Sequence, residues 1–411
     1  MPASNPNSSI VLVVDGLRAS SLGPYGNTWF DTPSFNRLAS QSLLFEQCIS
    51  DCPTDQLGVA RILKGQHACV PGDHGQYIMD SIGAAETESI LITSDASNIP
   101  ECRDCFDAVL EVDLPQPDEP AADFAGTGLA TYFAAAIDVI QKQQDPCMMF
   151  LDCPGIANHW DAPYEFRLRL ADEDDPEPSM LAMAQELQFD ENIDDPDLLL
   201  DFQMAYGGQV SLLDELLAIF LEQIENVAWA REALFGLTST RGFPLGEHGV
   251  VGYYRPILNS ELLQVPLMVR YPAAAGMKKA GMRSLQLVQP GSIYNVLHNW
   301  HLGEVDAAGT YPLIHDRQVF PNERESALIS KFDFDEAVHY AMQTRCWKLI
   351  KTAASRLYVK PDDCWEFNNV SQLCPRVAEE LEQELDKALE SLAAGTQPQF
   401  DLSDVLAFGV E

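Results

Sequence analysis

The chain has 411 residues, which is enough for one large or two modest domains, and 46% of them are hydrophobic, which is ample for a buried core. Its 62 acidic residues against 25 basic ones give a net charge of −37. This surplus should repel nucleic acid, anionic membrane surfaces and polyanionic substrates, unless a local basic pocket intervenes. We therefore expect a solubilising acidic surface and no nucleic-acid or membrane partner.

The first nine residues contain no basic stretch and no cleavable apolar segment, and the apolar residues 11–14 are too few for the core of a signal peptide. We find no apolar run of 18 residues and expect no membrane span. These features predict a cytoplasmic protein whose ten cysteines remain thiols. Cys102 and Cys105 have CxxC spacing, but a single such pair is a weak indication of a metal or redox site.

Residues 10–14 form an apolar run that ends at Asp15. Both faces of this strand are apolar, which is typical of a central strand in a parallel sheet. Because ligand sites of open α/β sheets lie at the carboxyl ends of the strands, Asp15 is a candidate site residue.

The following elements alternate in type, which favours an α/β fold. We expect a helix at 34–40, an edge strand at 43–48, strands at 89–94, 106–112 and 148–151, and helices at 129–141, 197–226 and 290–300.

A second candidate site follows the apolar run at 233–237, where the chain continues with Thr240, Arg241 and a glycine. Another apolar run, at 265–269, comes after a polar loop. This pattern predicts two buried strands with a polar loop at the carboxyl end of the first.

The pattern changes after about residue 318 to short strands and one helix, which indicates a small antiparallel α+β unit. We place its strands at 326–330, 338–344, 346–351 and 356–359, and its helix at 377–392. The predicted organisation is a large α/β domain over 8–317, an antiparallel subdomain over 318–395 and an acidic tail over 396–411.

Several of these segments resemble the sulfatases of the alkaline phosphatase superfamily. Leu-Gly-Pro-Tyr-Gly-Asn at 22–27, Leu-Gly-Glu-His-Gly at 245–249 and Val-Pro-Leu at 265–267 are similar to family motifs, and the resemblance extends over about residues 8–392. It implies a large mixed sheet flanked by helices, with a small C-terminal antiparallel α+β subdomain, and it implies sulfate-ester hydrolysis.

The resemblance implies a divalent cation, usually calcium, held by four side chains. Asp15 is retained, but Gly16, Thr240 and Arg241 occupy the other three family ligand positions. Calcium takes about six oxygen ligands, several of them carboxylates. The calcium expected of the family therefore lacks most of its ligands, and we predict no cofactor.

The resemblance also locates the nucleophile. Residues 60–65 are similar to a family motif, and ten residues before Gly65 stands Asp55, where the family has a cysteine or serine converted to formylglycine. A carboxylate cannot undergo this conversion. Cys52 is out of register by three residues, so we expect it to remain a thiol. Thr54 could act as a direct nucleophile or be the N-cap of a helix.

Three further residues complete the set of candidates. Glu247 and His248 could form an acid/base pair or could serve to shape their glycine-rich loop. By the resemblance, the family's lysine falls at Tyr253, and Arg255 is the nearest cation.

The leading hypothesis is a sulfatase-like protein, nominally a sulfuric ester hydrolase, that is catalytically impaired and retained for binding or regulation. One alternative is an active sulfate or phosphate ester hydrolase that uses Asp15, Thr54 or Asp55 with a weakly bound metal. Another is a structural partner of a second sulfatase-like subunit. The expected ligand is a small ester or an anion, and the oligomeric state is left open.

Overall fold

The computed structural model describes residues 7–72, 76–83, 87–99, 103–188, 195–253, 255, 257–275, 280–303, 327–334, 337–396, 398–403 and 405–406. Cys102 and the domain boundary that we placed at 317/318 lie outside these ranges.

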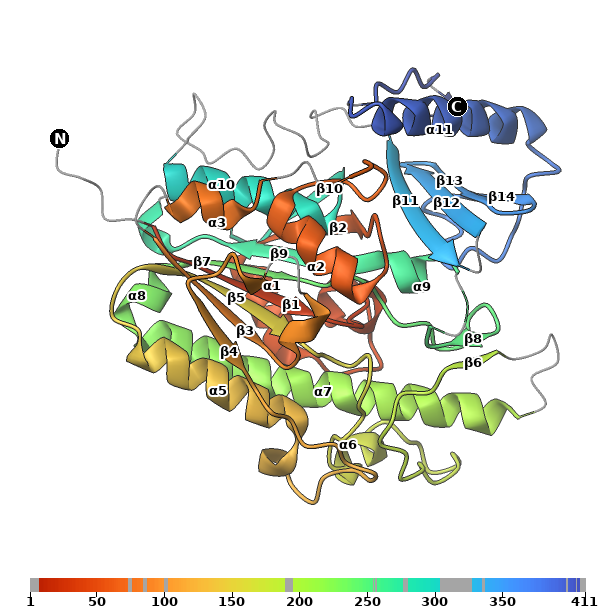
Figure 1. The fold of residues 1–411 in the computed structure, drawn as a ribbon. Helices are drawn as coiled ribbons and strands as arrows, with labels where there is room; N and C mark the ends of the chain where they lie inside the picture. The colour runs from red at the N-terminus through yellow and green to blue at the C-terminus, as the bar shows by residue number, and fades with distance from the viewer. Residues whose placement is uncertain are drawn as a thin grey trace.

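An eight-stranded sheet forms the centre of the large domain, in the order β10-β2-β9-β7-β1-β5-β3-β4 (Figure 1). Its strands are β1 (Ser9–Val14), β2 (Leu43–Ile49), β3 (Glu88–Thr93), β4 (Ala108–Glu111), β5 (Cys147–Cys153), β7 (Leu234–Thr238), β9 (Gln264–Arg270) and β10 (Met282–Val288). β1 pairs in parallel with both β5 and β7, whereas β9 runs antiparallel to β7 and β2. The predictions of a central parallel strand before Asp15 and of a large mixed sheet are both confirmed.

The edges of the sheet differ from the sequence-based expectation. β2 was predicted to be an edge strand, but it lies between β10 and β9, and β10 forms the edge. The sequence analysis missed β10 because this strand has no continuous apolar run: Met282 and Leu285 are exposed, and only its last two residues are buried. A strand that leaves its outer side open to solvent gives a weak hydrophobic pattern.

Helices cover both faces of the sheet (Figure 1). The core on one face includes side chains of α1 (Pro33–Gln41), α5 (Gly128–Lys142) and α7 (Pro196–Asn226). The core on the other face includes side chains of α2 (Asp55–Lys64), α3 (Ile78–Gly83) and α10 (Ile293–Leu302). Because β1 is buried from both sides, the strand that ends at Asp15 is fixed by packing on both of its faces.

The long helix α7 also holds the start of α1. The Asp214 carboxylate of α7 accepts hydrogen bonds from the backbone N–H groups of Ser34 and Phe35, at 3.0 and 2.9 Å. α7 is long and apolar enough to cross a membrane by length and composition, which the sequence analysis overlooked. However, 83% of its most apolar 18-residue window is buried inside the fold, as in the core helix of a globular domain.

The C-terminal subdomain is a four-stranded antiparallel sheet in the order β11-β12-β13-β14, with α11 (Pro375–Ala393) packed on it. The strands are β11 (Ala327–Phe334), β12 (Ala337–Thr344), β13 (Trp347–Lys351) and β14 (Ser355–Val359). The prediction of a small antiparallel sheet carrying one helix is confirmed. The short elements are β6 (Leu187–Gln188), β8 (Val250–Val251), α6 (Tyr164–Leu168), α8 (Ala228–Arg231) and α9 (Ser260–Leu263).

Candidate functional site

Asp15 follows the last residue of β1 and is 4% exposed. Its two carboxylate oxygens accept hydrogen bonds from Nε and Nη2 of Arg241, each at 2.8 Å. Arg241 lies beyond the end of β7, the parallel neighbour of β1. The carboxyl ends of the two strands thus bring these residues together, and the geometry is that of a bidentate ion pair.

The guanidinium of Arg241 is supported from its other side. It lies over the ring of Tyr253, 3.7 Å from the ring centroid, and the Tyr253 hydroxyl donates a 3.0 Å hydrogen bond to the carbonyl oxygen of Gly242. Cations are attracted to the faces of aromatic rings. Tyr253, to which the resemblance assigned the position of a family lysine, therefore holds a cation in place rather than supplying one.

Gly16 adopts φ +77°, a conformation that L-residues rarely adopt. A Cβ added there would come within 2.9 Å of the backbone nitrogen of Ala157. The loop after β5 thus packs directly against this glycine. An aspartate at position 16 would require this loop to move, so glycine here is a requirement of the local packing as well as a missing ligand.

Thr240 connects the site to the start of α2. Its hydroxyl lies 3.5 Å from Asp15 Oδ1, and its carbonyl oxygen accepts a 2.6 Å hydrogen bond from the Ser50 hydroxyl. A Cβ on Gly58 would come within 2.6 Å of Thr240 Cβ, so the first turn of α2 lies against Thr240. The structure therefore brings the predicted nucleophile segment next to the predicted metal positions.

At the start of α2, Thr54 occupies the N-cap position and Asp55 is the first helical residue. The prediction that Thr54 precedes a helix is confirmed, but its side chain makes no capping hydrogen bond. Instead the Thr54 hydroxyl lies 3.2 Å from the Cys52 sulfur. Burial raises the pKa of the Cys52 thiol, and the nearby Asp51 raises it further. This thiol is therefore protonated and weakly nucleophilic at neutral pH.

His248 and Glu247 do not act on each other as an acid/base pair. His248 Nδ1 lies 2.5 Å from Glu261 Oε1, and its Nε2 lies 3.1 Å from the Glu366 carbonyl oxygen. The Glu247 carboxylate instead pairs with Arg18 and accepts a 2.9 Å hydrogen bond from Leu245 N–H. Both side chains are engaged within the protein, which agrees with the interpretation that this motif shapes its loop.

Burial and neighbouring charges set the protonation of these groups. Burial disfavours the charged form of His248, but the hydrogen bond and charge of Glu261 outweigh it and raise the pKa of His248. For Glu247, burial is again opposed by its partner, and the Arg18 guanidinium lowers the pKa of that carboxyl. Both residues are therefore favoured in their charged forms.

The candidate Arg255 is exposed. His159 lies on the loop after β5, which binds back to Asp15 through a 2.9 Å hydrogen bond from Ile156 N–H to the Asp15 carbonyl oxygen. The buried Nε2 of His159 has no hydrogen-bond partner.

The residues around Asp15 do not fit a calcium ion. A cation bound to Asp15 would have to displace the Arg241 guanidinium from both carboxylate oxygens. Gly16 offers no side-chain ligand, and Thr240 offers one hydroxyl oxygen. Within the described part of the chain, no group of three or more His, Cys, Asp or Glu side chains is placed to hold a metal ion.

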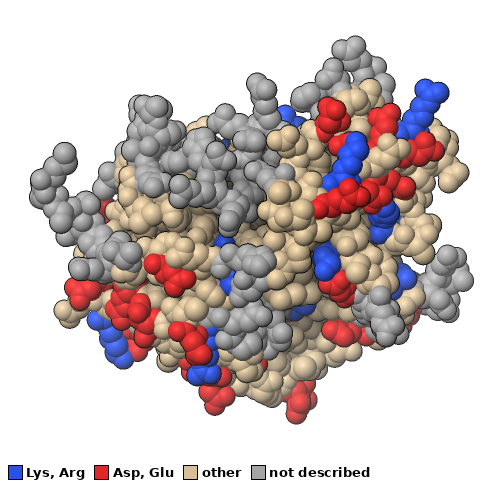
Figure 2. All heavy atoms as spheres, turned by 45° about the horizontal axis from the view of Figure 1, so that its top comes forward, with Lys and Arg blue, Asp and Glu red and all other residues tan. Residues whose placement is uncertain are grey.

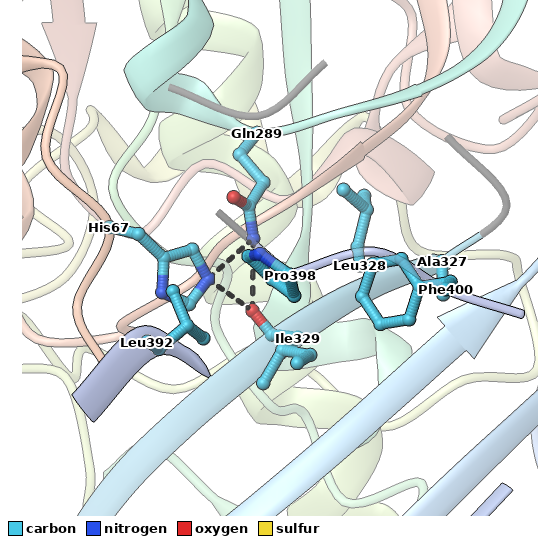
Figure 3. A pocket seen from close by; sticks show the side chains of 8 residues that line it. All are labelled: His67, Gln289, Ala327, Leu328, Ile329, Leu392, Pro398 and Phe400. Carbon is cyan, nitrogen blue, oxygen red and sulfur yellow. Dashed lines mark hydrogen bonds between the residues drawn. The ribbon is translucent and has the colours of Figure 1, made fainter. Parts of the chain in front are cut away.

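A small pocket lies away from this centre, where the large domain meets β11, α11 and the segment at 398–400 (Figure 3). His67 and Gln289 turn their nitrogens toward the Ile329 carbonyl oxygen, at 3.0 and 2.9 Å. The remaining lining is apolar: Ala327, Leu328, Leu392, Pro398 and Phe400. Its volume of about 10 Å³ is roughly the space for one water molecule, so we interpret it as a packing feature of the domain junction.

The surface charges agree with the acidic composition. On the face shown in Figure 2, acidic side chains are spread across the molecule and basic ones lie among them, with no extended basic area. This part of the surface therefore offers no obvious footprint for a polyanion.

The partners of Glu247 and His248 were not among the residues predicted from the sequence. Arg18, Glu261 and Glu366 are buried and charged, yet they are far in sequence from the groups they bind: Glu366 lies 118 residues after His248. Glu261 stands before two leucines, and an acid in an otherwise apolar segment is a sequence feature that could have indicated it as a buried partner.

No family model matches the chain, and no curated protein matches it. Solved structures do match it over nearly its whole length. The phosphonate monoester hydrolase of Agrobacterium radiobacter superposes with a TM-score of 0.74 and 16% identity, covering 94% of this chain and 96% of that one. A protein solved with its substrate D-glucosamine-2-N,6-O-disulfate gives a TM-score of 0.74 and 17% identity, covering 96% of this chain and 99% of that one.

A 2-O GAG sulfatase gives a TM-score of 0.71 and 12% identity, covering 98% of this chain and 96% of that one. At such low identity the similarity establishes the fold. The mixed eight-stranded sheet and the four-stranded C-terminal sheet thus have the fold of solved sulfatases and phosphonate monoester hydrolases.

Proposed function

We propose that this chain is a sulfatase-like protein that does not turn over esters by a metal-dependent route and is retained for binding or regulation. The ligand class proposed is a small sulfate or phosphate ester, or a related anion. The observation that carries this proposal is the bidentate pair of Asp15 with Arg241, because the one retained metal-ligand carboxylate already has a cation of the protein on both of its oxygens.

The chemistry of the reaction supports the same conclusion. A metal in such a hydrolase polarises the ester and stabilises the attacking oxygen. The arginine can offer fixed positive charge and hydrogen bonds to an anion, but it cannot lower the pKa of a bound water as a divalent cation does. Binding of an anion is therefore compatible with this centre, whereas rapid hydrolysis is not.

The discriminating experiment measures hydrolysis of aryl sulfates and aryl phosphates by wild-type protein, with added calcium and with a chelator. We expect no turnover above background in either condition, and no change in Asp15→Ala. Binding of inorganic sulfate and phosphate is measured in parallel by calorimetry. We expect Arg241→Gln to weaken it, while Arg283→Gln on the edge strand β10, an exposed arginine paired with Glu46, serves as the matched control.

An active enzyme predicts the opposite pattern. Asp15 would then be its remaining metal ligand, and its loss should reduce turnover by about a hundredfold or more, as when an electrostatic group that contacts the reacting atoms is removed. Wild-type hydrolysis that disappears in Asp15→Ala or on chelation would refute the proposal.

A further inference from the structure

The imidazole of His248 lies between two acceptors that belong to different parts of the fold. Nδ1 faces the carboxylate of Glu261, in α9 of the large domain, at 2.5 Å. Nε2 faces the backbone carbonyl oxygen of Glu366, at 3.1 Å, in the segment between β14 and α11. The ring also stacks on Phe367, with 5.2 Å between centroids. One side chain thus joins the connection between β7 and β9 (residues 239–263) to the C-terminal subdomain.

With Glu261 ionised, this geometry requires a doubly protonated ring; a Glu261 carboxyl that kept its proton, which burial favours by raising its pKa, would donate to Nδ1 of a neutral ring instead. A carbonyl oxygen can only accept a hydrogen bond, so Nε2 must donate to Glu366. Nδ1 donates to the Glu261 carboxylate when that group is ionised, and a neutral imidazole cannot make both donations. The amide of Asn259 is 3.2 Å from Nε2 while its buried Oδ1 has no partner, and exchanging the amide N and O would let Oδ1 share the same N–H.

The charged and titratable groups around the ring come from every element packed against it. Glu261 and Glu247 are on the large domain, the latter paired with Arg18. From the C-terminal subdomain come Lys348 of β13, Lys360 after β14, Glu366 and Tyr358. The two lysines already neutralise the Glu366 carboxylate, at 3.0 and 2.6 Å. Glu261 is therefore the acid with which protonated His248 forms its ion pair.

We propose that protonated His248 is a pH-dependent connection between residues 239–263 and the C-terminal subdomain, which closes when the ring carries two protons and loosens when it loses one. The connection reaches the candidate site through the backbone. Gly242 N–H donates a 2.7 Å hydrogen bond to Leu262 O, next to Glu261, and Gly242 directly follows Arg241. Loosening the connection would therefore loosen the segment that carries the guanidinium on Asp15.

The direction of the pH effect follows from the raised pKa of His248. A group whose pKa is raised on folding contributes its full stabilisation below its unfolded value, here about 6.5, and loses it as the pH rises through the folded value. The connection is thus closed in mildly acidic solution and opens in the window that begins near pH 6.5 and extends above it.

Two measurements on the intact chain test this. Nitrogen-15 NMR of the histidine rings, with the His248 signal assigned by its loss in His248→Gln, should show both ring nitrogens protonated at pH 6.5 and a titration above that pH. Hydrogen exchange of peptides from 242–253 and 362–367, corrected for the intrinsic pH dependence, should show protection that falls in both segments together. We expect a fall of about tenfold to a hundredfold, the effect of losing one hydrogen bond to a charged group.

Variants separate the connection from general destabilisation. His248→Gln should remove the pH-dependent step, and Glu261→Gln should lower the pKa of His248. His339→Gln, which removes a histidine from β12 of the C-terminal sheet, should leave the step in place. A neutral His248 ring at pH 6.5, or protection of the two segments that does not change with pH in wild type, would overturn the proposal. Neither readout uses a ligand or substrate, so the outcome is independent of the proposed function.

Discussion

Asp15 and Glu366 are both buried carboxylates neutralised by cations of the chain itself, but they are built differently. Asp15 has a single guanidinium on both oxygens, and the two side chains are 6% and 15% exposed. Glu366 receives the ammonium groups of Lys348 and Lys360, and the Lys348 and Glu366 side chains are completely buried. The Asp15–Arg241 pair thus keeps a slight exposure, mostly through Arg241, whereas the Lys348–Glu366 pair has none.

This difference in exposure predicts different roles for the two carboxylates, one in binding and one in stability. Charges removed from water are costly unless they are paired, so the cluster around Glu366 is sensitive to the loss of any one member. Burial alone would raise the pKa of Glu366, but the two lysines outweigh it and lower that pKa to about 2. The pair at Asp15 retains contact with solvent, so its loss should matter less to stability and more to what can bind there.

The largest expected effect comes from Glu366→Gln. This variant leaves Lys348 and Lys360 buried beside a neutral amide, and breaking a buried ion pair in this way costs about 3–5 kcal/mol. Chemical denaturation at pH 7 measures the loss. Glu390→Gln, on the exposed side of α11, is the control and should change the free energy of unfolding by less than about 0.5 kcal/mol.

The same variant has a pH signature. Because the pKa of Glu366 is lowered on folding, its contribution is present above its ordinary value of 4.5 and is lost as the pH falls toward 2. The difference in stability between wild type and Glu366→Gln should therefore shrink in this acidic range. A difference that stayed constant from pH 7 to pH 2 would show that the carboxylate charge is not the cause.

A smaller effect is expected from calcium. In wild type, millimolar calcium or a chelator should move the melting temperature by less than about 1 °C, because a ligand well below its dissociation constant stabilises little. Thr240→Asp combined with Arg241→Asn removes the competing cation and adds a carboxylate beside Asp15. Calcium at ten times its dissociation constant should then raise the melting temperature by about 2 °C.

Gly16 is left unchanged in that design because its positive φ and its contact with Ala157 make an aspartate there costly. Adding Gly16→Asp to the double variant should lower the melting temperature in the absence of metal. A wild-type protein that is purified with stoichiometric calcium, or that melts many degrees higher with calcium, would contradict the conclusion that Arg241, and not a metal ion, binds the Asp15 carboxylate.

The smallest effect concerns Cys52, which should remain an unmodified thiol. The structure places its sulfur next to Thr54, before the first residue of α2, and burial raises its pKa. Mass spectrometry of the peptide containing Cys52 should show the mass of cysteine, with Cys48, buried in β2, as the internal comparison. A loss of sulfur consistent with formylglycine at Cys52 would restore the hypothesis of an active hydrolase.

Much of the fold could be predicted because a buried strand or helix leaves a pattern of apolar residues in its own segment of the sequence. The run at 10–14 is apolar at every position since β1 is buried on both faces. β7 and most of β9 are buried as well and are rich in apolar residues. β10 was missed because its exposed residues interrupt the apolar pattern. β2 was misplaced because the order of strands in a sheet depends on which strands pair, and the pattern of one strand carries no such information.

Within the candidate site, the sequence determined which chemical groups are present: one retained carboxylate, Asp15, and an arginine, a threonine and a glycine at the other three positions. Only the tertiary structure decided that Arg241 binds Asp15 with two hydrogen bonds, and that His248 bridges Glu261 and Glu366. The physical reason is that ion pairs and hydrogen bonds act over a few ångströms in space, while their partners here are 226, 13 and 118 residues apart along the chain.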